Sequence, residues 1–223
     1  MAIRNYSEEE FQKILYAHLS PSEPVSSVEL LKGRTKRLQQ IRQALSSPGR
    51  HVFIFGDRGV GKTSLAQTAA RLYQSSDAEP ITLSCSAPFY QLITDLVCQC
   101  NLPKNPAAAA TAHKTKLKLG VPFLGAEREY GHGFDAPELK SINQTIIALR
   151  SALQRHSRAP VVIFDEFDLI EGDSDKRLFA DFVKQVSDQR LPVKLIFTGI
   201  GRAITDLLTA HNSIVRYLEN IRL

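Results

Sequence analysis

The sequence predicts an α/β protein, a three-layer αβα sandwich in which helices cover both faces of a mainly parallel five-stranded sheet. Short β-like runs alternate with helical patterns along the chain, as in repeated βαβ units. The 223 residues suffice for one large core. With 43% hydrophobic and 23% charged residues, the composition is that of a globular chain, which excludes global disorder and a fibrous rod.

We expect two parts, a leading helix with a connector over residues 1–27 and a main domain over 28–223. Apolar residues recur at helical spacing through Ser7–Leu19, and Ser7 and Glu10 can form a capping box at its start. The Pro- and Ser-rich stretch that follows favours an extended connector.

Helical and strand patterns then alternate. A helix over Arg34–Ser46 precedes the strand His51–Phe55, which leads through a glycine-rich turn into a helix ending at Tyr73. The further predicted strands are Ile81–Cys85, Pro160–Asp165, Lys194–Thr198 and Tyr217–Leu223. The further predicted helices are Pro88–Cys100, Leu139–His156, Lys176–Gln189 and Ala203–Thr209.

An irregular insert interrupts this alternation at about residues 101–136. Alternating lysines from Lys114 to Lys118 precede Glu127 and Glu129, which predicts a β-hairpin with opposite charges across it. The sequence has no internal repeat.

Positive charge is concentrated between Leu30 and Gly56. Six basic residues lie there without an acid, so the total net charge of +5 leaves 5 − 6 = −1 for the rest of the chain. Such a segment can hold the phosphates of a nucleotide or of nucleic acid, or it can be a solvated helix face. Both interpretations stay open on the sequence.

The sequence disfavours a membrane-spanning protein and a protein stabilised by disulfide bonds. No apolar run approaches the roughly 18 residues of a membrane span, and the N-terminus lacks the apolar core of a secretory signal. We therefore expect a cytoplasmic protein in which Cys85, Cys98 and Cys100 are reduced, small buried residues. Cys98 and Cys100 have no nearby His or Cys to complete a tetrahedral metal site.

The first chemical motif is a glycine-rich run between a predicted strand and a predicted helix, Gly56-Asp-Arg-Gly-Val-Gly-Lys-Thr63. Glycines let backbone N–H groups curl around a β-phosphate, Lys62 can reach the β- and γ-phosphates, and the Thr63 hydroxyl can ligate Mg²⁺. We therefore expect ATP and Mg²⁺ as cofactors. The expected nucleotide-binding residues of this loop are Gly56, Asp57, Arg58, Gly59, Val60, Gly61, Lys62, Thr63 and Ser64.

Two acids, Asp165 and Glu166, follow the apolar run Val161–Phe164. Ligands of an open parallel sheet bind at the carboxyl ends of its strands, so both carboxylates are expected to face the triphosphate. Asp165 would hold Mg²⁺, and Glu166 would orient and deprotonate the attacking water. Asp168 is a weaker candidate, for which a strand-end or helix-cap role is favoured.

A hydroxyl ends the predicted strand Leu195–Thr198, beside the strand of Asp165. At that place Thr198 could bond the γ-phosphate or the attacking water and so report the nucleotide state. The alternative is a threonine that caps the following turn.

These residues resemble the motifs of AAA+ ATPases over roughly Val28–Leu223. The glycine-rich loop and the acidic strand end correspond to the two Walker motifs, and Thr198 falls where the family has its sensor 1. The segment from Leu31 to Arg34 resembles the lead-in of the initiator branch, which implies that Gly33 and Arg34 border the adenine. The likeness is to prokaryotic ATPases of the origin-recognition and initiator group and to those that regulate DNA transposition.

The resemblance also implies an arginine finger. Arg216 stands where the family carries it, late in the helix after Thr198, and would complete a neighbour's site. Arg202 is the competing candidate, and a plain surface arginine is the alternative. The family normally adds a helical lid with a sensor 2 arginine after the fifth strand, whereas this sequence ends at Leu223, so we expect either a truncated core or a lid that is supplied otherwise.

The function implied is an ATP-binding and hydrolysing module whose nucleotide state controls assembly with copies of itself in a DNA-associated process. The expected partners are ATP or ADP, further copies of the chain, DNA, and a partner or effector protein, with no membrane. The alternative is a STAND-like signalling switch, in which slow ATP hydrolysis couples sensing to oligomerisation of an effector, for example in antiphage defence. The phosphate loop is common to both.

Overall fold

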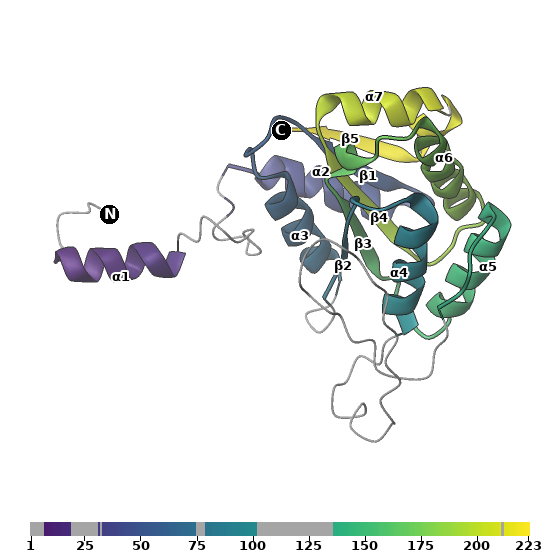
Figure 1. Cartoon of the computed structure of the whole chain (residues 1–223). Helices are drawn as coiled ribbons and strands as arrows, with labels where there is room; N and C mark the ends of the chain where they lie inside the picture. Colours follow the sequence, from purple (N-terminus) through teal and green to yellow (C-terminus); the bar gives the residue numbers. More distant parts are fainter. Residues whose placement is uncertain (1–6, 19–30, 32, 75–78, 102–135, 211) are drawn as a thin grey trace, which may run out of the picture.

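The computed structural model describes residues 7–18, 31, 33–74, 79–101, 136–210 and 212–223 (Figure 1). One sheet forms the centre of the fold, with five parallel strands in the order β2-β3-β4-β1-β5. The strands are β1 (His51–Phe55), β2 (Ile81–Ser84), β3 (Val161–Asp165), β4 (Lys194–Gly199) and β5 (Leu218–Arg222). The predicted α/β class with a parallel five-stranded sheet is confirmed.

Helices cover both faces of this sheet (Figure 1). Val52 and Ile54 of β1 lie in the core beneath α2 and α3, whereas Phe53 lies in the core on the opposite face, because successive side chains of a strand alternate in direction. The first face carries α2 (Thr35–Ser46) and α3 (Lys62–Tyr73). The other face carries α4 (Phe89–Asn101), α5 (Ile142–Leu153), α6 (Asp173–Asp188) and α7 (Gly201–Ala210). None of the described helices is both long and apolar enough to cross a membrane.

The leading helix α1 (Glu8–His18) begins with the predicted capping box. The backbone N–H of Ser7 donates to the Glu10 carboxylate at 3.0 Å, and the N–H of Glu10 donates back to Ser7 Oγ at 3.3 Å. The bonds from Ser7 lower the pKa of the Glu10 carboxyl below its ordinary value.

Several element boundaries differ from the sequence prediction for local reasons. Helix α5 begins at Ile142 because the Ser141 side chain caps it, accepting from the N–H of Gln144. Helix α6 begins a turn earlier than predicted, at Asp173, because its polar, acidic first turn suits a helix N-terminus without showing apolar periodicity. The hairpin predicted for the insert lies outside the described residues.

Among the residues that the structure describes, two short 3-10 turns were not predicted, η3 (Phe167–Leu169) and η4 (Asn212–Arg216). The first is anchored by aromatic packing. The Phe167 ring meets Phe53 and Phe197 edge-on, at centroid distances of 5.9 and 5.5 Å, and all three rings are buried. These contacts fix the backbone that follows β3.

A buried histidine occupies the start of β1. His51 is 1% exposed, and its Nδ1 accepts from the backbone N–H of Leu195 at 3.1 Å. Burial, and then the nearby charge of Lys194, lowers its pKa from 6.5 to about 3. The Lys194 ammonium is held by the carbonyls of Ser47 and Arg50, at 2.7 and 3.3 Å. The fold therefore requires a neutral imidazole at this place.

We expect the stability of the fold to fall between pH 6.5 and about 3 because of His51. Its pKa is lower in the folded than in the unfolded chain, so the unfolded chain binds the extra proton in this window. His51→Asn keeps an acceptor for Leu195 and removes the titration. Below pH 6 the wild-type free energy of unfolding should drop by about 1.4 kcal/mol per pH unit more than that of the variant. Urea unfolding at pH 7, 6 and 5 measures this difference, and equal slopes would contradict it.

Candidate functional site

The carboxyl ends of β1, β3 and β4 lie level with one another at one edge of the sheet. Ile54 of β1 pairs with Thr198 of β4, and Phe164 of β3 pairs with Phe197. The loop after β1, the acids that follow Phe164, and Thr198 therefore meet at this edge. The predicted grouping of these residues is what the structure shows.

The glycine-rich loop connects β1 directly to the N-terminus of α3. Gly61, the residue before the helix, has a left-handed backbone with φ 87°. At Gly56 an added Cβ would lie 2.9 Å from the Leu223 carbonyl oxygen, so a side chain does not fit there. The first turn of α3 begins at Lys62, and its N-terminal dipole makes the loop attractive to an anion.

The Lys62 side chain folds back over this loop. Its Nζ donates to the carbonyl oxygens of Gly56, at 3.2 Å, and Asp57, at 2.8 Å. The ammonium thus lies inside the curve of the loop on two acceptors that a phosphate oxygen can replace.

Two hydroxyls converge on the Asp165 carboxylate. Thr63 Oγ1, from the first turn of α3, is 3.0 Å from both carboxylate oxygens. The Thr198 hydroxyl, from the end of β4, donates to Asp165 Oδ1. Hydroxyl and carboxylate oxygens are the ligand type that Mg²⁺ prefers, so Thr63 and Asp165 fit the ion for which the sequence predicted them.

Thr198 also joins β4 to the turn after β3. It is fully buried, and its Oγ1 accepts from the backbone N–H of Glu166 at 3.2 Å. The described bonds of Thr198 are therefore to the acidic pair and not to the turn that follows β4, which was the alternative role. Glu166 itself has a left-handed backbone, φ 56° and ψ 48°, which is uncommon for a residue with a side chain, and it is exposed. The acid proposed as base is thus held in a strained turn at the rim of the site.

An ion pair crosses from the loop to this turn. Arg58 Nη2 lies 3.5 Å from Asp168 Oδ2, and the side chains are 83% and 13% exposed. Asp168 therefore faces the phosphate loop, whereas the sequence favoured a strand-end or helix-cap role. The sequence analysis missed this pair because the two residues are 110 positions apart and no local spacing relates them. The signal that could have indicated it is the positive charge of Arg58 inside the loop.

The lead-in to α2 contacts the same loop. Arg34 Nη2 donates to the Val60 carbonyl at 3.1 Å, and Gly33 before it has a φ of 74°. The basic residues of the segment between Leu30 and Gly56 lie in different environments. Arg50 pairs with Glu219 at 2.8 Å. The basic residues exposed on α2 are Lys36, Arg37 and Arg42.

Arg216 lies in η4 and not late in the helix after Thr198, as the resemblance implied. Asn212 and Ser213, which are weak helix formers, begin this separate turn. The guanidinium of Arg216 is 3.9 Å from Asp188 and 4.7 Å from the centre of the Tyr217 ring.

Arg216 and Arg202 lie at opposite edges of the sheet. Leu218, two residues after Arg216, pairs with His51 at the start of β1, whereas the phosphate loop follows its end, about 13 Å further along a five-residue strand. Arg202 follows β4 at the edge of the site, is 85% exposed, and lies 3.9 Å from Asp206.

The cysteines do not form a reactive group. Burial, and then the charges of the acids after β3, raises the pKa of the Cys85 thiol, and burial raises the pKa of Cys100 to about 12. Cys98 is half-buried and not buried as expected, because it lies on the side of α4 away from the main core. In the parts of the chain that the structure describes, no three His, Cys, Asp or Glu side chains gather to hold a metal.

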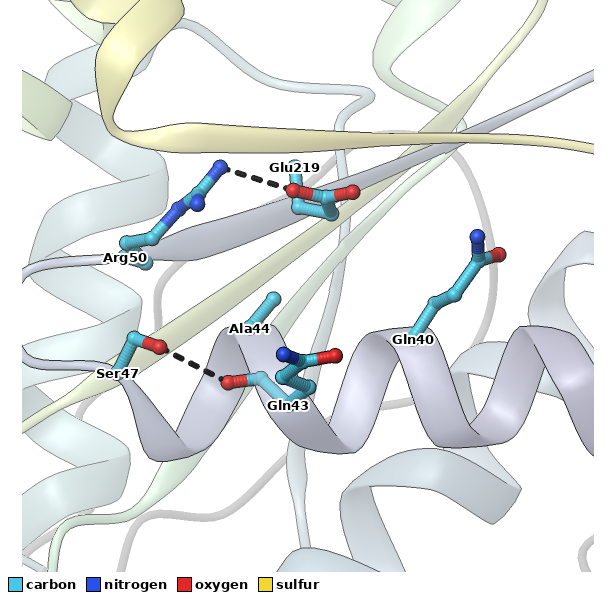
Figure 2. Close-up of a pocket in the computed structure, with 6 residues that line it drawn as sticks. All are labelled: Gln40, Gln43, Ala44, Ser47, Arg50 and Glu219. Carbon is cyan, nitrogen blue, oxygen red and sulfur yellow. Dashed lines mark hydrogen bonds and ion pairs between the residues drawn. The ribbon is translucent and has the colours of Figure 1, made fainter.

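The described part of the chain includes a cavity beside the sheet and another near the ends of its strands. One of about 250 Å³ lies between α2 and β5, and Figure 2 shows the Arg50–Glu219 pair on one side of it and Gln40 and Gln43 on the other. Since Glu219 pairs with Val52 near the start of β1, this cavity lies away from Asp165. A second, of about 460 Å³, adjoins the site between the segment after β2 and the segment from Leu169 to Asp175.

A family model described as an AAA ATPase domain matches residues 30–196. No curated protein matches the chain in sequence. Solved structures with a similar fold include the Walker-type ATPase of Pyrococcus abyssi (17% identity, TM-score 0.55, covering 90% of this chain and 56% of that one) and Cdc6p from Pyrobaculum aerophilum (16%, 0.55, 92% and 48%). A third is the Aeropyrum pernix ORC1 protein in complex with DNA (15%, 0.52, 86% and 45%). The chain spans about half the length of these structures.

Proposed function

The chain belongs to the AAA ATPase domain family, and on that premise we propose that it is a Mg²⁺-dependent ATPase whose nucleotide state controls assembly with further copies of itself. The observation that carries the ATPase proposal is the convergence at one sheet edge. Lys62 lies inside the phosphate loop, and the Asp165 carboxylate is held by the hydroxyls of Thr63 and Thr198.

The loop and its lysine bind the phosphates. A triphosphate entering the loop replaces the two carbonyls that hold the Lys62 ammonium, so the lysine exchanges neutral partners for charged ones. The N-terminal dipole of α3 adds to this attraction. Arg34, bonded to the loop at Val60, supports the loop from the side on which the family places the adenine.

Hydrolysis requires a water in line with the γ-phosphate. Glu166, exposed at the rim, orients this water and takes its proton. Thr198 holds the backbone N–H of Glu166 and the carboxylate of Asp165 together. Thr63 and Asp165 would hold Mg²⁺, which would neutralise charge at the phosphate oxygens.

Glu166→Gln should bind Mg-ATP with nearly wild-type affinity and lose most hydrolysis, by about 10²-fold or more, because only the proton acceptor is removed. Lys62→Ala is the contrasting control, which should lose ATP binding itself. Calorimetry measures binding, and single-turnover release of phosphate measures the chemistry. Unchanged single-turnover hydrolysis in the glutamine variant would refute the assignment of the base.

We further propose that assembly completes the site through Arg216 of a neighbouring copy. This arginine is 65% exposed and lies at the sheet edge opposite its own phosphate loop, which suits a residue that acts on another chain. At the nucleotide site of the neighbouring copy, the Arg216 cation would stabilise charge on the transferring phosphoryl group.

A mixture of Arg216→Ala and Glu166→Gln subunits tests this role. Each variant alone should be inactive, whereas some interfaces in the mixture pair an intact Glu166 site with an intact Arg216, so activity should partly recover. Sedimentation confirms that the subunits assemble. A mixture no more active than the sum of its parts would point to a structural role for Arg216, or to Arg202 as the finger.

The DNA-associated process is proposed on two observations. The similar ORC1 structure is of a complex with DNA. Helix α2 exposes Lys36, Arg37 and Arg42 and has no acid. These three side chains can contact backbone phosphates without reading bases.

Duplex DNA binding should weaken steeply with salt. Replacing Lys36, Arg37 and Arg42 together by Gln should lower the slope of log affinity against log salt by roughly 2 to 3, since each phosphate contact contributes about 0.9. The control removes three other basic residues that are also exposed, Arg71, Lys140 and Arg155. Fluorescence titration with labelled duplex at several salt concentrations measures the slope for the α2 variant and for the control variant. Absence of binding at low salt would favour the signalling switch instead.

A further inference from the structure

The ion pair between Arg58 and Asp168 lies at the edge of the candidate nucleotide site. Arg58 belongs to the phosphate loop, and Asp168 belongs to η3, directly after the acids of β3. Their separation of 3.5 Å is at the upper limit for a hydrogen bond. The contact is therefore weak enough to be exchanged.

Asp168 is the fixed partner of the pair. Its turn is closed by the bond from the Leu169 N–H to the Glu166 carbonyl at 2.9 Å, and Phe167 anchors it in the core. The carboxylate also lies over the end of β4, since a Cβ added at Gly199 would meet Asp168 Oδ1 at 3.5 Å. Because only 13% of its side chain is exposed, the packing around Asp168 holds the carboxylate in one position.

Arg58 is the movable partner. Its side chain is 83% exposed, and Asp168 is the acid that it faces. Asp168 lies two residues after Glu166, so its contact places the guanidinium on the side of the loop that faces this acidic turn. The proposed site puts the transferring phosphate between Lys62, Asp165 and Glu166, so a rotation of the exposed Arg58 side chain can move its charge from Asp168 toward that phosphate.

We propose that Arg58 is a second side-chain cation for the γ-phosphate of ATP, and that Asp168 holds this arginine when ATP is not bound. This inference rests on the proposed ATPase function. A guanidinium binds phosphate through paired hydrogen bonds, which are stronger than its single long contact with Asp168. Arg58 thereby distinguishes ATP from ADP, because ADP lacks the phosphate for which it leaves Asp168.

Asp168 competes with the nucleotide for the same arginine. Asp168→Asn removes the competing charge and frees Arg58, so ATP should bind more tightly while ADP binding stays the same. The gain is small, because an exposed ion pair contributes little. In a chain that already carries Arg58→Gln, the Asp168→Asn change should have no effect on ATP affinity.

Calorimetric titration with Mg-ATP and with Mg-ADP tests the proposal. Arg58→Gln should weaken ATP binding by about tenfold and ADP binding by less than about twofold. Arg58→Lys keeps the charge without the paired geometry and should fall between wild type and Arg58→Gln. The matched control is Arg71→Gln on α3. This change breaks the 2.8 Å ion pair between Arg71 and Glu79 and should alter neither the ATP affinity nor the ADP affinity.

The outcomes separate the two proposals. Equal losses for ATP and ADP in Arg58→Gln, or no loss in either, would overturn the role of Arg58 while leaving the ATPase assignment in place. An effect of Asp168→Asn that persists without Arg58 would show that the carboxylate acts by another route and would overturn the competition. A wild-type chain that binds neither nucleotide would overturn both proposals.

Discussion

The arrangement of the site depends on one carboxylate that is held from two sides. Asp165 accepts from Thr63 on the helix after β1 and from Thr198 on β4. Its strand is not adjacent to β1, since β4 lies between them. The two hydroxyls therefore set the distance between the phosphate loop and the acidic turn, and they compensate a charge that is partly withdrawn from water.

The rigidity of this edge comes from the phenylalanine layer beneath it. Phe53, Phe164 and Phe197 lie on three neighbouring strands and stack, with centroids 5.2 and 5.9 Å apart. Phe167 packs edge-on against two of them, and Phe179 of α6 closes the cluster at 5.1 Å from Phe167. The core thus ends immediately below Glu166 and Asp168. The turn after β3 therefore carries both a core residue, Phe167, and acids of the candidate site.

The sequence was sufficient for those parts of the site that local chemistry determines. Glycine spacing before Lys62 and the two acids after an apolar run predict the loop and the strand end, and parallel strands bring such ends together. The pairs Arg58–Asp168 and Arg34–Val60 were not predictable, because they join residues 110 and 26 positions apart through strand order and register. The short turn that contains Arg216 was missed because three to five residues show no periodicity.

Glu166 combines an acid side chain with a backbone conformation that suits glycine or asparagine better. Holding it there costs the fold on the order of 1 kcal/mol. In a relative that did not use this residue in the proposed hydrolysis, a glycine or asparagine at the same place would relieve the strain and raise stability. The strained glutamate is therefore a position at which stability and the proposed chemistry oppose each other.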